Sequence, residues 1–307
     1  MRDEALYVIV PYFNFANYTS GLFNLKHFIQ NITTFKNVNV VIVEGYNNEC
    51  LPDLSDKVYK HIKLHVKDTL WVKENLINIG FKHLPSTWKY GAWIDRDIIF
   101  CNPNWVEESV EKLKESDLIQ PWTECLFLDS KYQHEHIDFG EWKIGDTFIA
   151  QSFCSIEKLK RNKQLINYKK FSHPGQAWCV TREFYEHMGG LYEHCILGSG
   201  DGVMMFSLMG IEEHEMIVRL GESAKKFYSK VQECRLDSIN GMIIHNYHGS
   251  LAKRKYVSKH QIYDKHNYNP LTFLKYNEHG LIEYTSAGRV IEQDIKEYFI
   301  QRDEDSK

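Results

Sequence analysis

Short apolar runs alternate with helical patterns along the first part of this 307-residue chain. Residues 5–10 form a continuous apolar run that ends at Pro11, a pattern typical of a strand buried on both faces of a parallel sheet. Similar patterns predict strands over residues 37–43, 58–66 and 90–94, and helices over residues 22–32 and 71–84. This β-α-β-α-β order predicts an α/β fold with a mixed, mainly parallel sheet flanked by helices.

The pattern is less regular after residue 100. Asn102 and Pro103 predict a helix start, because Asn favours the N-cap and Pro the first helical position. Thr181 is expected to cap a short helix that ends at Gly189. Residues 122–150 lack a clear period and predict a long functional loop over the site. We also expect strands over 117–120, 177–180 and 242–245, and helices over 155–170, from about 201, over 222–233, over 256–266 and from about 286.

Composition narrows the class of protein. A hydrophobic fraction of 43% is enough for one large core, and a net charge of -4 argues against a nucleic-acid-binding surface. No apolar stretch is long enough to span a membrane, and the apolar run near the start is too short for a signal peptide. The seven cysteines are scattered singly, which indicates reduced thiols. We therefore expect a folded cytoplasmic protein.

Polar residues follow several of the predicted strands. Asn14, Glu44 and Asp95 come after three of them, and ligands of open α/β sheets bind beyond the carboxyl ends of the strands. Asp95 and Asp97 follow one buried strand at a spacing that allows both carboxylates to face one point. Carboxylate oxygens suit Mg²⁺ or Mn²⁺, ions that also bind diphosphates. The alternative is a surface turn, in which Asp-x-Asp is common.

A second strand end carries imidazoles and cations. His245 and His248 follow the apolar residues 242–244, so either imidazole can complete a metal site begun by the aspartates. Lys253 and Arg254 come next and can neutralise a leaving diphosphate. The alternatives are hydrogen-bonded histidines near the core and a solvated basic helix start.

Two further segments suggest acceptor chemistry. Asp201 follows a glycine-rich turn, where it can accept a proton from an acceptor hydroxyl, and Gly200 allows close approach of a ligand. Trp178 can stack on the apolar face of a sugar. The alternatives are an N-cap aspartate in a tight turn for Asp201 and a core position for Trp178.

Together these segments resemble the GT-A fold glycosyltransferases, in particular a group found in viruses, phages and bacteria. The resemblance covers roughly residues 5 to 285. It rests on the order and spacing of six short segments, at residues 8–14, 71–78, 95–97, 174–178, 198–201 and 245–249. In this family the Asp95-Arg96-Asp97 segment corresponds to the DxD element.

The resemblance implies a role for each segment. Asp97 would bind the metal directly, Asp95 would contact the ribose or the metal, and His245 or His248 would be the third protein ligand. Residues near the nucleotide-sugar donor would be Pro11, Tyr12, Asn14, Glu44, Lys73, Asn75 and Arg96. Asp201 would match the base of inverting members, although many of these enzymes carry Glu-Asp where this chain has Gly200-Asp201.

The predicted function is transfer of a sugar from a nucleotide-diphosphate sugar, with UDP as the expected nucleotide, to a hydroxyl of a glycan or other acceptor. Mn²⁺ or Mg²⁺ would be required, and the reaction would invert the anomeric centre. We expect one domain over residues 1–285, with a donor half to about 120 and an acceptor half beyond it, and a helical tail over 286–307. The alternatives are a sugar nucleotidyltransferase, for which residues 11–14 offer no glycine-rich loop, and a non-catalytic sugar-binding module.

Overall fold

A seven-stranded sheet forms the centre of the computed structural model, which describes residues 4–128, 149–155, 172–255 and 258–306. The strand order is β11-β6-β10-β4-β1-β2-β3. Pairing is parallel except at β10, which is antiparallel to both of its neighbours. The predicted mixed, mainly parallel sheet is therefore confirmed. Its strands are β1 (Leu6–Phe13), β2 (Val38–Tyr46), β3 (Lys60–His65), β4 (Tyr90–Ile94), β6 (Leu118–Gln120), β10 (Ala177–Thr181) and β11 (Leu236–Ser238).

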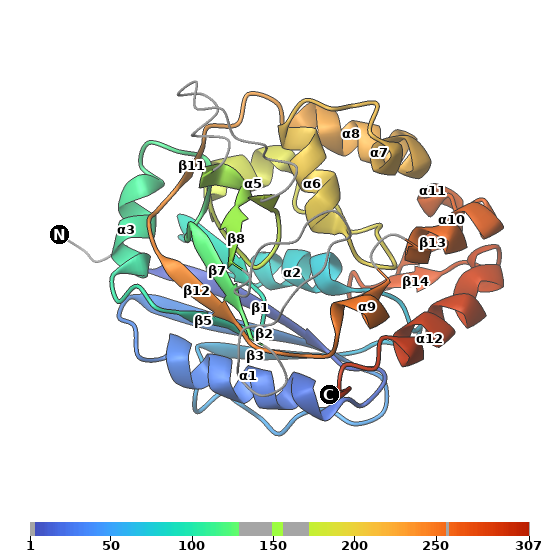
Figure 1. Cartoon of the computed structure of the whole chain (residues 1–307), viewed down its shortest axis with the longest axis horizontal. Helices are drawn as coiled ribbons and strands as arrows, with labels where there is room; N and C mark the ends of the chain where they lie inside the picture. Colours follow the sequence, from blue (N-terminus) through green and yellow to red (C-terminus); the bar gives the residue numbers. More distant parts are fainter. Residues whose placement is uncertain (1–3, 129–148, 156–171, 256–257, 307) are drawn as a thin grey trace.

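Helices cover both faces of this sheet (Figure 1). Because side chains alternate along a strand, Val8 belongs to the same core cluster as Leu25 of α1 (Thr19–Ile32), whereas Ile9 belongs to the cluster that includes Leu76 of α2 (Lys73–Lys82). The core on the α2 side also includes side chains from a helical layer. This layer consists of α5 (Arg182–Met188), α6 (Gly200–Leu208), α7 (Glu215–Leu220) and α8 (Glu222–Lys230).

A second sheet has the strand order β5-β12-β7-β8-β9. Strand β12 runs antiparallel to β5, with His245 opposite Ile98, and the Asn246 amide donates to the Asp97 carbonyl at 2.8 Å. This pairing brings two chemically interesting segments, 95–97 and 245–248, to the same place. The strands are β5 (Ile98–Phe100), β7 (Glu124–Phe127), β8 (Ile149–Ser152), β9 (Ser172–His173) and β12 (Met242–His245).

The last part of the chain returns to the first. Helix α12 (Glu292–Gln301) buries Tyr298 and Phe299, and the Tyr18 hydroxyl donates to the Phe299 carbonyl at 2.7 Å. Figure 1 shows the C-terminus beside the end of α1. Between β12 and α12 lie α9 (Leu251–Arg254), a 3-10 turn (Ser258–His260), α10 (Gln261–His266), α11 (Pro270–Phe273), β13 (Leu274–Tyr276), β14 (Ile282–Tyr284) and a second 3-10 turn (Gly288–Ile291).

Two predicted helix boundaries have different outcomes. Thr181 caps α5 as expected, since its hydroxyl accepts from the Phe184 amide at 3.2 Å. The N-cap prediction for Asn102 is wrong. Helix α3 (Trp105–Lys112) begins after Asn104, and the Asn102 side chain instead accepts from the Asn104 amide in the preceding turn.

The predicted loop over 122–150 contains two strands near its ends, β7 and β8, and its residues 129–148 lie outside the described residues. The helix expected over 155–170 also falls almost entirely outside them. All seven cysteines are free in the structure. Within the described ranges, no helix combines the length and apolarity needed to cross a membrane.

Candidate active site

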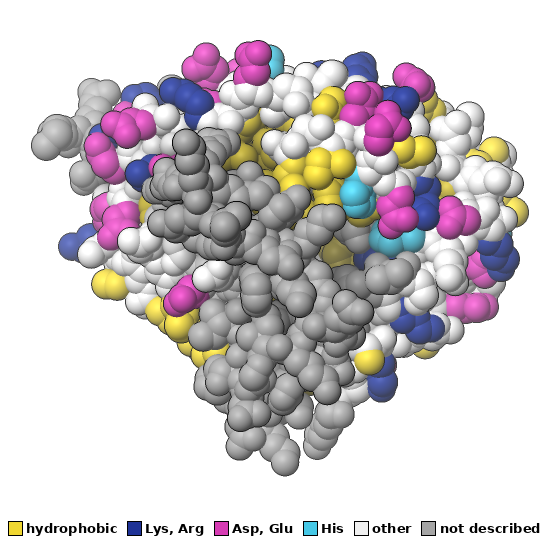
Figure 2. All heavy atoms as spheres, turned by 45° about the horizontal axis from the view of Figure 1, so that its top comes forward, with side chains coloured by type: hydrophobic (Ala, Val, Ile, Leu, Met, Phe, Trp, Pro, Cys, Tyr) yellow, Lys and Arg dark blue, Asp and Glu magenta, His cyan; other side chains and the backbone are white. Residues whose placement is uncertain are grey.

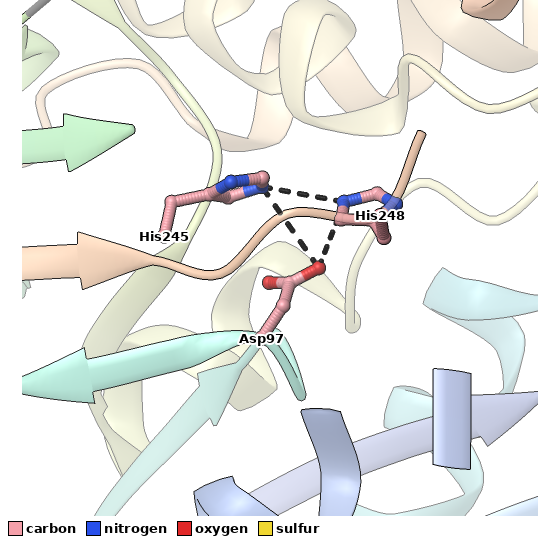
Figure 3. A group of neighbouring side chains, drawn as sticks. All are labelled: Asp97, His245 and His248. Atoms are coloured by element: carbon pink, nitrogen blue, oxygen red, sulfur yellow. Dashed lines mark hydrogen bonds and ion pairs between the residues drawn. The ribbon is translucent and has the colours of Figure 1, made fainter. Parts of the chain in front are cut away.

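Asp97, His245 and His248 point toward one another at the junction of the two sheets (Figure 3). Asp97 Oδ2 lies 2.9 Å from His248 Nε2 and 3.9 Å from His245 Nε2, and the two Nε2 atoms are 3.3 Å apart. Each residue is at most 8% exposed. The predicted convergence of an aspartate and two imidazoles from distant parts of the sequence is therefore observed.

The chemistry of this triad fits a divalent cation. Burial lowers the pKa of His245 well below its usual value, which favours the neutral imidazole that binds metals. Burial alone would raise the pKa of Asp97, but His245 and His248 outweigh it and hold that pKa well below its usual range. Asp97 Oδ1 is buried with no hydrogen-bond partner among the described residues. A buried carboxylate oxygen normally has a partner, and a bound cation would provide one here. Two imidazoles and one carboxylate suit a transition-metal ion such as Mn²⁺.

Asp95, the other predicted metal ligand, has a different contact. Its Oδ1 lies 2.5 Å from Lys73 Nζ. Burial would lower the pKa of Lys73, but Asp95 and Asp201 outweigh that effect and raise it. Lys73 and Asp95 therefore form a charged pair beside the triad, and direct contact of Asp95 with a metal or a ribose stays a prediction.

The triad opens into a cleft of about 720 Å³, a volume typical of small-molecule sites. Its lining includes Trp71, Lys73, Asp95 and Asp201 together with the three triad residues. Figure 2 shows hydrophobic, histidine and acidic side chains side by side on one face of the molecule. The cleft thus combines a candidate cation site with polar groups and apolar walls.

Asp201 lies in the first turn of α6, one residue after Gly200. Its Oδ1 accepts from the Gly202 amide at 2.9 Å, and the N-cap of the helix is Ser199. The carboxylate lines the cleft, as the predicted base requires. A side chain at Gly200 would meet the Glu74 carboxyl carbon at 2.7 Å, so Gly200 accommodates a second acid beside Asp201.

Sequence reasoning missed that second acid, Glu74. It is 6% exposed and lines the cleft. Burial raises its pKa to about 7; the Lys73 charge lowers that pKa and the Asp201 charge raises it. In the sequence Glu74 is indistinguishable from an ordinary first-turn acid, which is favourable in any helix.

The residues predicted to contact the nucleotide lie at the carboxyl ends of β1, β2 and β4, where Tyr12 is the register partner of Glu44. Glu44 accepts from the Leu51 amide at 2.7 Å and lies 3.0 Å from His61 Nε2. These residues belong to one sheet edge, but none of them lines the cleft that the described residues define. The set comprises Pro11, Tyr12, Asn14, Glu44 and Arg96.

Two of the other predicted contacts are used in packing. Asn75 is 2% exposed, and its amide nitrogen donates to Glu193 Oε2 and to the Gly280 carbonyl, both at 2.9 Å. Trp178 is 1% exposed, and its Nε1 donates to the Pro174 carbonyl at 2.7 Å. Trp178 is thus a core residue, as the alternative in the sequence analysis expected. Contact between Asn75 and the donor stays a prediction.

The two predicted diphosphate cations also have protein partners. Lys253 Nζ pairs with Asp303 Oδ2. Arg254 is buried, and its Nη2 donates to the carbonyls of His248 and Gly249 at 3.5 and 3.3 Å. Arg254 thus supports the loop that carries His248, and a role of either cation toward a phosphate stays a prediction.

The segment after α12 reaches the site and was missed from the sequence. The Arg302 guanidinium lies 5.0 Å from the centre of the Trp71 ring and lines the cleft. Glu304 Oε2 lies 3.7 Å from His248 Nδ1. Asp305 accepts from the backbone amides of Thr19 and Ser20 at the start of α1, at 2.7 and 2.8 Å. In the sequence, residues 302–305 have the composition of a solvated charged tail. No local pattern therefore predicted that they reach the site.

Comparison with known proteins gives matches at the level of structure. No protein-family model matches the chain, and no curated protein matches it. The catalytic domain of Drosophila β1,4-galactosyltransferase 7, in complex with xylobiose, is similar at 13% identity over 76% of this chain, with a TM-score of 0.36. TarS 1–349 of S. aureus, in complex with UDP-GlcNAc, is similar at 11% identity over 85% of this chain, with a TM-score of 0.48. This chain covers 64% of each of those two chains.

The mannosyltransferase PcManGT from Pyrobaculum calidifontis, in complex with GDP-Man and Mn²⁺, is similar at 12% identity over 96% of this chain and 69% of that chain, with a TM-score of 0.43. These three similarities are to glycosyltransferase structures, each at 13% identity or less and with a TM-score below 0.5. The activity of this chain is argued from its own site.

Proposed function

We propose that the protein is a metal-dependent glycosyltransferase that moves a sugar from a nucleotide-diphosphate sugar to a hydroxyl of a glycan or other acceptor. One observation carries the proposal: the buried Asp97–His245–His248 triad opens into a cleft that also holds Asp201. A cation-binding triad and a separate carboxylate in one cleft are what transfer to a hydroxyl requires.

Each residue has a role in this proposal. Asp97, His245 and His248 hold a divalent cation, Mn²⁺ or Mg²⁺, which supplies Lewis-acid stabilisation of the donor diphosphate. Asp201 accepts the proton of the acceptor hydroxyl. The bond from the acceptor oxygen to C1 forms while the bond from C1 to the phosphate oxygen breaks, and the nucleoside diphosphate leaves with that electron pair. Attack from the opposite face makes the reaction inverting.

The finer assignments belong to the same proposal. UDP is the proposed nucleotide, bound at the sheet edge of Tyr12 and Glu44 by the donor half, residues 1–120. The acceptor half is residues 121–285, and the tail 286–307 completes the chain. Lys73 pairs with Asp95 within the donor half. We propose that the reaction takes place in the cytoplasm.

Asp97→Asn provides the test, with Asp56→Asn at an exposed position as the matched control. Thermal unfolding is followed with UDP-glucose, UDP-galactose, UDP-GlcNAc and GDP-mannose, each with and without Mn²⁺, and release of the nucleoside diphosphate is then measured. A ligand present at 100 times its Kd stabilises the folded state by about 2.7 kcal/mol. We expect Mn²⁺-dependent stabilisation and release in the wild type and in Asp56→Asn, and neither in Asp97→Asn.

Three results would contradict the proposal. If Asp97→Asn retains full activity, the triad is not the metal site. Release of pyrophosphate from a nucleoside triphosphate and a sugar 1-phosphate would identify a nucleotidyltransferase. Saturable binding of nucleotide sugars with no turnover, even with a panel of mono- and disaccharide acceptors, would identify a sugar-binding module.

A further inference from the structure

We propose that Glu304 is a positioning residue of the metal site: its carboxylate faces His248 Nδ1 and fixes the imidazole so that Nε2 points at the cation. This inference rests on the proposed function, because it assigns a purpose to a residue behind one of the metal ligands. It adds the segment after α12 to a site otherwise built from the two sheets.

The two nitrogens of His248 have different surroundings. Nε2 faces the triad, at 2.9 Å from Asp97 Oδ2 and 3.3 Å from His245 Nε2. Nδ1 faces away from it and is buried, without a hydrogen-bond partner in the described part of the chain. Glu304 Oε2 lies 3.7 Å from this Nδ1. A carboxylate behind the remote nitrogen of a metal-binding histidine fixes its tautomer and ring orientation.

Glu304 is itself held in place. Its Oε1 accepts from Arg302 Nε at 3.0 Å and from Arg302 Nη2 at 2.7 Å, and its Oε2 lies 3.4 Å from Arg96 Nη2. The residue is 8% exposed. A carboxylate that is buried and paired in this way keeps its charge and its direction, as a positioning group must.

Gly249 brings the backbone of this segment against the His248 loop. Its φ is +87°, and a side chain there would meet Glu304 Cα at 2.7 Å and the Asp303 carbonyl oxygen at 2.8 Å. Only glycine adopts this conformation and leaves this space at low cost. The loop that carries the metal ligand is therefore shaped to receive the segment that carries Glu304.

The residues on either side of Glu304 anchor the segment without touching the triad. Asp303 pairs with Lys253, and Asp305 accepts from two backbone amides at the start of α1. The Tyr247 hydroxyl donates to the Ser306 carbonyl at 2.8 Å. Asp303 offers a matched control, because its replacement removes the same charge one residue from Glu304.

The competing explanation is structural: Glu304 would only neutralise Arg96 and Arg302. The two explanations differ in their effect on the metal. A structural partner of two arginines changes stability, whereas a positioning residue changes the affinity for the cation in folded protein. Removal of carboxylates behind metal-binding histidines typically weakens metal binding about 10- to 100-fold.

The test uses the full chain, freed of metal with a chelator and titrated with MnCl₂ alone. Free Mn²⁺ is followed by electron paramagnetic resonance, and circular dichroism confirms that each variant is folded. We expect Glu304→Gln to raise the Kd for Mn²⁺ about tenfold or more, Glu304→Asp to have an intermediate effect, and Asp303→Asn to stay within about twofold of the wild type. Asp97→Asn should bind Mn²⁺ least.

Two outcomes would overturn the inference alone. In the first, the wild type binds Mn²⁺ and Glu304→Gln binds it equally well. In the second, Glu304→Gln and Asp303→Asn weaken binding to the same extent, which would reflect the charge of the segment and not the position of Glu304. If Glu304→Gln does not fold, Glu304→Asp takes its place in the comparison. A Kd for Mn²⁺ equal to that of the wild type would then overturn the inference, and a weaker affinity than that of Asp303→Asn would support it. A wild type that binds no Mn²⁺ would overturn the proposed metal site itself, and the inference with it.

Discussion

Replacing Glu74 with glutamine is expected to stabilise the protein at and above neutral pH, although it removes a charged group. Glu74 is 6% exposed and lines the cleft. Its carboxyl group occupies the space that a side chain at position 200 would need. Glutamine has nearly the same shape and imitates the protonated acid. The variant therefore removes only the cost of holding a negative charge in this buried place.

The magnitude follows from the pKa of Glu74, which burial raises from its ordinary value of 4.5 to about 7; Lys73 opposes the change and Asp201 adds to it. Between these two pH values the folded state holds a proton that the unfolded chain has lost, so the stability of the wild type falls as the pH rises through this window. One pKa unit corresponds to 1.36 kcal/mol. The wild type should therefore lose about 3 kcal/mol relative to Glu74→Gln, with equal stabilities near pH 4 and the full difference by about pH 8.

Urea unfolding of both proteins at pH values from 5 to 8, in the presence of a chelator, measures this difference. Glu278→Gln is the control, because the Glu278 side chain is 87% exposed and its replacement should leave the pH dependence of the wild type unchanged. If the stabilities of the wild type and Glu74→Gln run parallel across this range, the carboxyl is not held in its protonated form. The electrostatic description of the cleft would then be wrong.

Further variants test the residues around the site by urea unfolding. Lys253→Ala should change the free energy of unfolding by less than about 0.5 kcal/mol, since its ion pair with Asp303 is exposed. Arg254→Ala should lower the free energy of unfolding by about 2 to 4 kcal/mol, because it leaves two buried carbonyls without a donor. Asn75→Ala should cost about 1 to 3 kcal/mol and leave the Kd for a UDP-sugar unchanged, since its amide bonds to Glu193 and to the backbone. A loss of UDP-sugar affinity in Asn75→Ala at unchanged stability would support the predicted donor contact instead.

The centre of the main sheet was predictable because β1, β2 and β4 are largely buried, whereas β11 (Leu236–Ser238) was not predicted. Strands β1, β2 and β4 are continuous apolar runs, and the helices between them show apolar residues at helical spacing. The same reasoning located the triad, since Asp97 comes shortly after the apolar strand β4, and His245 and His248 lie at and just beyond the end of the apolar strand β12. Local pattern and tertiary position agree in these segments.

Other features left no local signal. Strands β7 and β8 belong to a stretch without a period, and β9 is only two residues long. Their places in the second sheet depend on pairing with strands that are distant in sequence: β7 with β12, β8 with β7, and β9 with β8. The charged residues after α12 have the composition of a solvated tail. Their places are set by partners that are remote in sequence, such as Arg96 for Glu304 and the first turn of α1 for Asp305.

Strand pairing and buried neighbours hold the triad in place. Asp97 directly precedes β5, and His245 ends β12, so the antiparallel pairing of these strands fixes the separation of the two ligands through the backbone. His248 lies three residues further on, in a loop braced by Arg254 and by the segment of Glu304. Asp95, in contrast, is held by the long side chain of Lys73 and not by strand pairing. The backbone and buried partners therefore position the three triad ligands, whereas the direction of Asp95 depends on a side-chain pair with Lys73.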